Sequence, residues 1–150
     1  MRSIKRVIMV DDDPLSHIIC KGNIRRIAAE IEFKQFTSPE MGIEYIQSAY
    51  TEAAGECPTV LLLDIKLPEM SVWRFLEKYD NIESNIKNQI AVFLLSSSVD
   101  HRDKQRAAEN KYVKGFLMKP FKKATVEEVL GPSPAFIGPA AFRTATYLLQ

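Results

Sequence analysis

Four groups of polar residues in this chain each follow a short apolar, strand-like run. They are three aspartates, a single aspartate, three serines, and a lysine before a proline: Asp11-Asp12-Asp13, Asp64, Ser96-Ser97-Ser98 and Lys119-Pro120. In a parallel α/β sheet the carboxyl ends of the strands meet at one edge, which is where ligands bind. Carboxylates, a hydroxyl and an ammonium gathered at that edge suit a divalent cation and a phosphoryl group.

The acidic run offers ligands for the cation. Adjacent carboxylates repel each other by ~4 kcal/mol at about 4 Å and an effective dielectric constant of about 20, unless a cation lies between them. Mg²⁺ prefers oxygen ligands and usually combines one or two carboxylates with water and phosphate oxygens. Asp11 and Asp12 are therefore candidate Mg²⁺ ligands, with helix capping as the ordinary alternative. Asp13, directly before Pro14, fits the cap.

The remaining three groups could act on the phosphoryl group itself. Asp64 closes the most apolar run, and beside a metal ion its carboxylate could form an acyl phosphate. Ser96 could donate a hydrogen bond to a phosphoryl oxygen, and Lys119 could neutralise the charge of the transferred group. Each residue alone has an ordinary alternative, namely a strand-end cap, a turn serine or a surface lysine. Their joint arrangement favours phosphoryl chemistry.

Alternating strand-like and helix-like segments must bring these groups together. The expected strands are 6–10, 32–36, 59–63, 91–95 and 115–118, and the expected helices are 15–30, 38 toward 54, 72–79, 102–110 and 122–130. Five such alternations predict an α/β fold, a doubly wound parallel sheet with helices on both faces. The Pro- and Gly-rich residues 131–150 form a tail that could be a disordered extension or could dock its apolar residues on the domain or on a partner.

Bulk composition narrows the function. A chain of 150 residues suits one domain, and a net charge of +1 gives no field that would attract nucleic acid. No segment approaches the ~20 apolar residues of a membrane span, and the first apolar run is too short for a signal peptide. Cys20 and Cys57 lack metal-ligand spacing. We expect a cytoplasmic protein without membrane insertion or direct nucleic-acid binding, with both histidines, His17 and His101, at the surface.

The chain resembles the receiver domains of two-component response regulators, which have the chemotaxis-type fold. The resemblance covers about residues 4–130. It rests on four motifs whose order and spacing match the family: Val10-Asp11-Asp12-Asp13-Pro14, Leu62-Leu63-Asp64-Ile65-Lys66-Leu67-Pro68, Leu95-Ser96-Ser97-Ser98 and Gly115-Phe116-Leu117-Met118-Lys119-Pro120. The resemblance implies a flavodoxin-like (βα)5 fold with five strands in the order 2-1-3-4-5, and a site between the first and third strands.

The resemblance also implies roles for the site residues. Asp64 is similar to the phosphoacceptor, which a histidine kinase or phosphotransfer protein modifies in this family. Asp11 and Asp12 are similar to the acidic pair that binds Mg²⁺, and Asp64 and the backbone carbonyl of Lys66 would complete the protein ligands. The family acts as a signalling switch, so the expected reactions are limited to self-phosphorylation and autodephosphorylation.

Three further positions match the residues that respond to phosphorylation. Ser96 resembles the hydroxyl switch, Phe116 the aromatic switch, and Lys119 the lysine that pairs with the phosphoryl group. The Lys119–Pro120 peptide bond would be cis. Phosphorylation would draw Ser96 toward the phosphate and turn Phe116 inward, which would alter the face made by the fourth helix, fifth strand and fifth helix. Without an effector domain, output would pass through an unknown protein partner, a phosphorelay or homodimerisation on that face.

The chain departs from the family pattern at two positions, and two alternative functions remain open. Met70 is followed by Ser71 and Val72 instead of the Asp-Gly that is frequent in the family, so a different turn is expected there. Lys66 places a cation two residues after the acceptor, where we expect it to alter autodephosphorylation. One alternative is a degenerate receiver that serves as a constitutive interaction module. The other is a Mg²⁺-dependent aspartyl phosphohydrolase, which typically needs a second acid where this chain has Lys66.

Overall fold

The computed structural model describes residues 3–98 and 100–130. Its elements in chain order are β1 (Arg6–Val10), α1 (Pro14–Ile27), β2 (Glu32–Phe36), α2 (Pro39–Ala49), the 3-10 helix η1 (Glu52–Ala54), β3 (Thr59–Asp64), α3 (Val72–Asp80), α4 (Ser84–Lys87), β4 (Ile90–Ser96), α5 (His101–Glu109), β5 (Val113–Met118) and α6 (Lys123–Leu130). The predicted tail, residues 131–150, lies outside the described residues.

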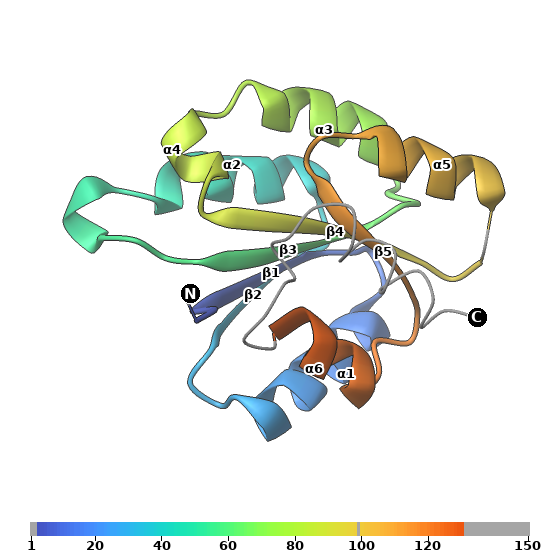
Figure 1. Ribbon diagram of the computed structural model, residues 1–150, viewed down its shortest axis with the longest axis horizontal. Coiled ribbons are helices and arrows are strands. Elements are labelled where there is room, and N and C mark those ends of the chain that lie inside the picture. Colours follow the sequence, from blue (N-terminus) through green and yellow to red (C-terminus); the bar gives the residue numbers. More distant parts are fainter. Residues whose placement is uncertain (1–2, 99, 131–150) are drawn as a thin grey trace.

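Within the described residues, five strands form one parallel sheet in the order β2-β1-β3-β4-β5. Helices α2 to α5 cover one face of this sheet, and α1 and α6 cover the other (Figure 1). The arrangement confirms the predicted α/β fold, its doubly wound form and the strand order that the family resemblance implied.

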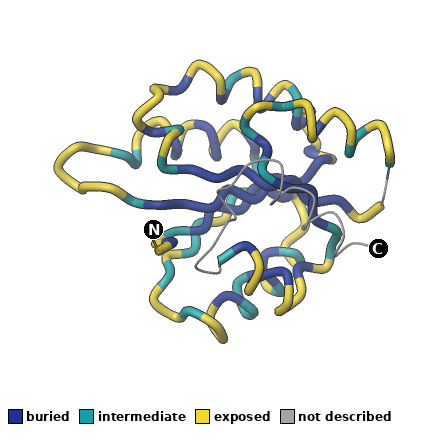
Figure 2. Tube along the Cα trace, in the orientation of Figure 1, coloured by how far each residue is buried: buried dark blue, intermediate teal, exposed yellow. Residues whose placement is uncertain are grey.

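The central strands β3 and β4 are apolar between their end residues because both of their faces are covered. Every residue of β3 and of β4 is buried, and Figure 2 shows this as a dark blue centre beneath exposed outer helices. Alternate residues enter different cores, since successive side chains of a strand point to opposite faces. Leu61 and Leu63 pack in the core beneath α2 to α5, whereas Leu62 packs in the core beneath α1 and α6. Edge strand β2 has no fully buried residue.

Polar residues cap the starts of α1 and α3, the two helices that begin next to the site. The carboxylate of Asp13 accepts a hydrogen bond from the Leu15 amide, and Pro14 occupies the first turn, so Asp13 is the cap of α1 as predicted. Ser71 caps α3 in the same way through the Arg74 amide. The loop after the acceptor therefore ends at a serine cap rather than at the glycine common in the family.

The structure also departs from the predicted boundaries. Helix α4 was not predicted, because four residues are too few to show a helical period. As a result, the fourth and fifth predicted helices are α5 and α6. Helix α1 ends at Ile27 instead of residue 30, where the Ala28 amide donates to the Ile24 carbonyl. Strand β5 begins two residues early, at Val113, which pairs with Val92 across an irregularity in the register.

Candidate functional site

The four predicted groups meet at the carboxyl edge of the sheet. Asp11 directly follows β1, Asp64 and Ser96 are the last residues of β3 and β4, and Lys119 directly follows β5. The Lys119 ammonium lies 2.7 Å from Oδ2 of Asp11 and 2.8 Å from Oδ2 of Asp64. Asp12 joins them, because one carboxylate oxygen from each of the three aspartates lies within 4.8 Å of the others.

Both buried carboxylates are oriented by the backbone that follows them. Oδ1 of Asp11 accepts a hydrogen bond of 2.9 Å from the Asp13 amide, and Oδ1 of Asp64 accepts one of 2.9 Å from the Lys66 amide. Such bonds from two residues further along the chain are typical of aspartate turns. One oxygen of each acid is thereby fixed, and the other faces the ammonium of Lys119.

Burial makes the electrostatics of this group strong. Asp11 is fully buried, whereas Asp12 is exposed. Burial raises the pKa of Asp11 above its ordinary range, although the contacts with Lys119 and the Asp13 amide oppose this effect. Burial alone would lower the pKa of Lys119, but its contacts with Asp11 and Asp64 outweigh that effect and raise the pKa. Lys119 is therefore a permanent ammonium at neutral pH.

The acidic residues fit a hard divalent cation. Oδ2 of Asp11 is buried, and among the described residues its partner is the Lys119 ammonium, 2.7 Å away. A buried carboxylate oxygen with so few partners is costly. With the exposed carboxylate of Asp12 beside it, the site offers the oxygen donors that Mg²⁺ prefers. The role of the Lys66 carbonyl stays a prediction.

The residues expected to respond to phosphorylation lie on the neighbouring strands. The Ser96 hydroxyl donates to the Ser98 carbonyl at 2.6 Å and accepts from the Ser98 amide at 3.2 Å, so it bonds its own loop. The Lys119 amide donates to the Ser96 carbonyl at 2.8 Å, and the Lys119–Pro120 peptide bond is cis. Phe116 is fully buried, the position that was expected to follow phosphorylation.

His17 is a residue that the sequence interpretation missed. It was expected at the surface, and that prediction was wrong, since the side chain is buried in α1. Its Nε2 lies 2.7 Å from the backbone carbonyl of Asp11. The signal was available in the spacing, because His17, Cys20 and Ile24 fall at i, i+3 and i+7, which is one face of a helix.

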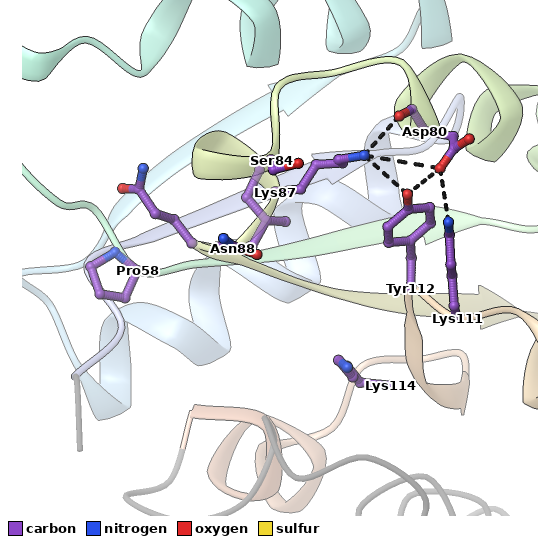
Figure 3. A pocket seen from close by; sticks show the side chains of 10 residues that line it. Pro58, Asp80, Ser84, Lys87, Asn88, Lys111, Tyr112 and Lys114 are labelled. Carbon is purple, nitrogen blue, oxygen red and sulfur yellow. Dashed lines mark hydrogen bonds and ion pairs between the residues drawn. The ribbon is translucent and has the colours of Figure 1, made fainter.

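A cavity lined by described residues lies at the opposite, amino edge of the sheet from this site. It measures about 640 Å³ and opens at the amino ends of β4 and β5 (Figure 3). Several of its polar groups bind one another: the Lys87 ammonium donates to the Asp80 carbonyl and to the Tyr112 hydroxyl, which in turn donates to the Asp80 carboxylate. Lys111 lies 3.3 Å from the same carboxylate. The cavity therefore does not compete with the carboxyl edge as the candidate site.

Comparison with known proteins agrees with the geometry. The sequence model of the response regulator receiver domain matches residues 7–130. No curated protein matches the chain. No helix in the described part of the chain is both long and apolar enough to cross a membrane.

Several solved structures share the fold. A response regulator receiver protein from Dyadobacter fermentans is 26% identical with a TM-score of 0.73, over 83% of this chain and 94% of that one. A two-component response regulator from Cytophaga hutchinsonii is 27% identical with a TM-score of 0.72, over 85% and 95%. The chemotaxis response regulator CheY4 of Vibrio cholerae, 17% identical with a TM-score of 0.66 over 85% and 97%, shares the fold. The match over residues 7–130 shows that this chain belongs to the response regulator receiver domains of two-component signalling.

Proposed function

We propose that this receiver domain is a phosphorylation switch in which Asp64 accepts a phosphoryl group with Mg²⁺ held by Asp11 and Asp12. The donor is a histidine kinase or a phosphotransfer protein. The observation that carries the proposal is the shared ammonium, since Lys119 lies within 2.8 Å of a carboxylate oxygen of both Asp11 and Asp64. This arrangement supports the proposal, because a fixed positive charge beside Asp64 would stabilise the oxygens of an incoming phosphoryl group.

The chemistry is a transfer between two nucleophiles. An oxygen of the Asp64 carboxylate attacks the phosphorus atom of the donor's phosphohistidine, the new P–O bond forms as the P–N bond breaks, and the imidazole leaves with the electron pair. Mg²⁺, when bound, neutralises charge on the phosphoryl oxygens. Lys119 then exchanges part of its contact with Asp64 for the new phosphoryl oxygens. The Lys66 amide keeps the acid oriented through Oδ1.

Ser96 supplies the moving part of the switch in this proposal. To reach a phosphoryl group on Asp64, its hydroxyl must exchange its bonds to Ser98 for a bond to a phosphoryl oxygen, which reshapes the loop after β4. Phe116 needs no inward turn from the buried position it has here. A local charge change that alters a loop between two arrangements is the usual logic of such switches.

Output passes, in this proposal, through the face made by α5, β5 and α6, which adjoins the Ser96 loop. An unknown downstream protein, a phosphorelay partner or a second copy of the chain would bind there. In this proposal residues 4–130 make up the receiver. Receiver domains in general act as switches rather than enzymes, and we extend that to this chain.

The direct test is phosphorylation by a small donor. Acetyl phosphate with Mg²⁺ should add one phosphoryl group to the wild-type chain, seen by intact mass, and should shift the backbone amide resonances near Asp64 and Ser96. Asp64→Asn should take up no phosphoryl group, and EDTA should abolish the reaction in the wild type. An unmodified wild type with unchanged spectra would favour the alternative of a degenerate receiver that acts as a constitutive interaction module.

Lys66 argues against a phosphohydrolase and shapes the lifetime of the phosphoryl group. A second acid at this position would assist hydrolysis, but here the side chain is an exposed ammonium. We expect Lys66 to contact the phosphoryl group or an acidic neighbour, and Lys66→Ala to change the rate of autodephosphorylation measured after removal of the donor. Equal rates for the variant and the wild type would contradict this role.

A further inference from the structure

We infer that His17 is a positioning residue that holds the backbone of the acidic pair in the geometry needed for the cation. The inference rests on the proposed Mg²⁺ site at Asp11 and Asp12. His17 is 1% exposed and lies in α1, away from the reacting atoms. It reaches the site through one contact, between its Nε2 and the carbonyl oxygen of Asp11 at 2.7 Å.

The chemistry of the two atoms determines which of them donates the hydrogen bond. A carbonyl oxygen only accepts hydrogen bonds, so Nε2 of His17 must carry the hydrogen and donate it. The second ring nitrogen, Nδ1, is buried and has no hydrogen-bond partner among the described residues. Among the described residues, the imidazole therefore forms one hydrogen bond, to the first residue of the acidic pair.

With the contact from His17, hydrogen bonds hold three polar atoms of Asp11. Its amide donates to the Phe36 carbonyl at 3.0 Å, and its Oδ1 accepts from the Asp13 amide at 2.9 Å. Its carbonyl is held by His17. The remaining polar atom, Oδ2, faces Lys119 and is the atom available to a cation. Of these contacts, the bond to His17 is the one that ties Asp11 to a packed helix.

The same carbonyl belongs to the peptide that joins Asp11 to Asp12. Fixing its direction therefore orients the start of Asp12 as well as the end of Asp11, so one donor influences both carboxylates. Residues that orient metal ligands from outside the coordination sphere typically change metal affinity about 10–100-fold when they are replaced. A buried histidine that only filled space would have no such effect.

The experiment compares three variants of the full chain by titration with MgCl₂ in a calorimeter. His17→Leu keeps an apolar, buried side chain but removes the donor, and should raise the dissociation constant for Mg²⁺ at least about 10-fold. His17→Gln returns an N–H donor on a side chain of similar reach and should restore most of the affinity. Cys20→Ala is the matched control, because Cys20 is buried one turn further along the same face of α1 and packs in the core beneath α1 and α6.

Urea denaturation in EDTA and the rate of phosphorylation by acetyl phosphate complete the comparison. We expect Cys20→Ala to lose stability while its Mg²⁺ affinity stays within about twofold of the wild type, and His17→Leu to show the reverse. Unchanged Mg²⁺ affinity in His17→Leu, or an equal loss in Cys20→Ala, would overturn the inference. A wild type that binds no Mg²⁺ and accepts no phosphoryl group would instead overturn the proposed function, and the inference with it.

Discussion

At the scale of single residues, the site is held together by one ammonium that serves two carboxylates. The side chain of Lys119 is 17% exposed, and those of Asp11 and Asp64 are 0% and 9% exposed. Removing only the cation from such a group is costly, because two carboxylates then remain close together in a poorly hydrated place. Its value to the molecule is specificity of geometry rather than a large net gain in stability.

Lys119→Ala should therefore destabilise the chain strongly when no metal is present. We expect the free energy of unfolding in EDTA to fall by ~3 kcal/mol, the low end of the range for a broken buried ion pair. Mg²⁺ should restore part of this loss, since it can take the place of the ammonium between the acids. Urea denaturation with and without MgCl₂ measures both effects. Lys122→Ala, at an exposed position nearby, should change stability by no more than about 0.5 kcal/mol.

Most of the site could be predicted from the residue types at the ends of the strands. The residue that this reasoning missed, His17, is buried. Asp11, Asp64, Ser96 and Lys119 could be placed together from sequence because each follows an apolar run and parallel strands end at one edge. His17 could not be recognised as part of the site from its type alone. Its role depends on the direction in which α1 presents its inner face, and packing of the helix on the sheet decides that direction.

At the scale of elements, helix α1 both carries the acidic site at its start and presents an apolar surface beside it. Leu15 and Ile18 are 59% and 68% exposed, and their spacing of three residues makes these two large apolar side chains neighbours on the helix surface. Leu15 also lines a cavity of about 270 Å³ together with Lys119 and Pro120. In the proposed function, a protein that delivers a phosphoryl group to Asp64 would approach this edge, so the first turns of α1 are well placed to contact it.

Ile18→Asp should separate protein donors from small donors. Transfer from a purified histidine kinase that phosphorylates the wild-type chain should slow about 10-fold, the effect of losing ~1.4 kcal/mol of contact energy. Phosphorylation by acetyl phosphate should keep its rate, because that donor needs no docking surface. Ile27→Asp is the matched control, since Ile27 is exposed on the same helix about 13 Å further along. Equal slowing by both variants would argue against docking at the first turns.

Two helical glycines offer a second comparison between elements. A Cβ on Gly42 of α2 would lie 2.9 Å from Cγ2 of Val10, a stiff and buried side chain at the end of β1, whereas a Cβ on Gly22 of α1 would meet no atom within 4 Å. Gly22→Ala should raise the free energy of unfolding by about 0.5–1 kcal/mol through helix propensity. Gly42→Ala should lower it by ~1 kcal/mol, because overpacking outweighs the same gain. Urea denaturation of both variants checks the opposite signs.

At the scale of the whole molecule, the fold was predictable because its central strands are covered on both faces. Continuous apolar runs, such as the one ending at Asp64, can be read directly as buried parallel strands. Helix α4 and the early start of β5 could not be read in this way. Both depend on contacts between distant segments, and α4 is shorter than two helical turns. The sequence pattern therefore predicts layers and order well, and boundaries less well.

The free energy of unfolding in EDTA should depend on pH through the ionisation of Asp11. Burial raises the pKa of Asp11 above its ordinary value of about 3.9, so the folded chain holds this proton at pH values where the unfolded chain has lost it. Ionisation of Asp11 therefore costs stability as the pH rises from about 4 through the raised pKa. The stability of Asp11→Asn relative to the wild type should grow over that window and then level off.

Urea denaturation at a series of pH values measures this difference. A relative stability of Asp11→Asn that falls with rising pH would contradict the assignment.

The hydrogen bond from the Lys119 amide to the Ser96 carbonyl has a practical consequence for following the switch. It joins the ends of β4 and β5 between the residue that would neutralise the phosphoryl group and the residue that would move toward it. The deuterium exchange rate of that single amide proton thus records whether the two strand ends stay joined while Ser96 changes partners. The backbone itself thus provides a reporter, on the same residue as the ammonium that would neutralise the phosphoryl group.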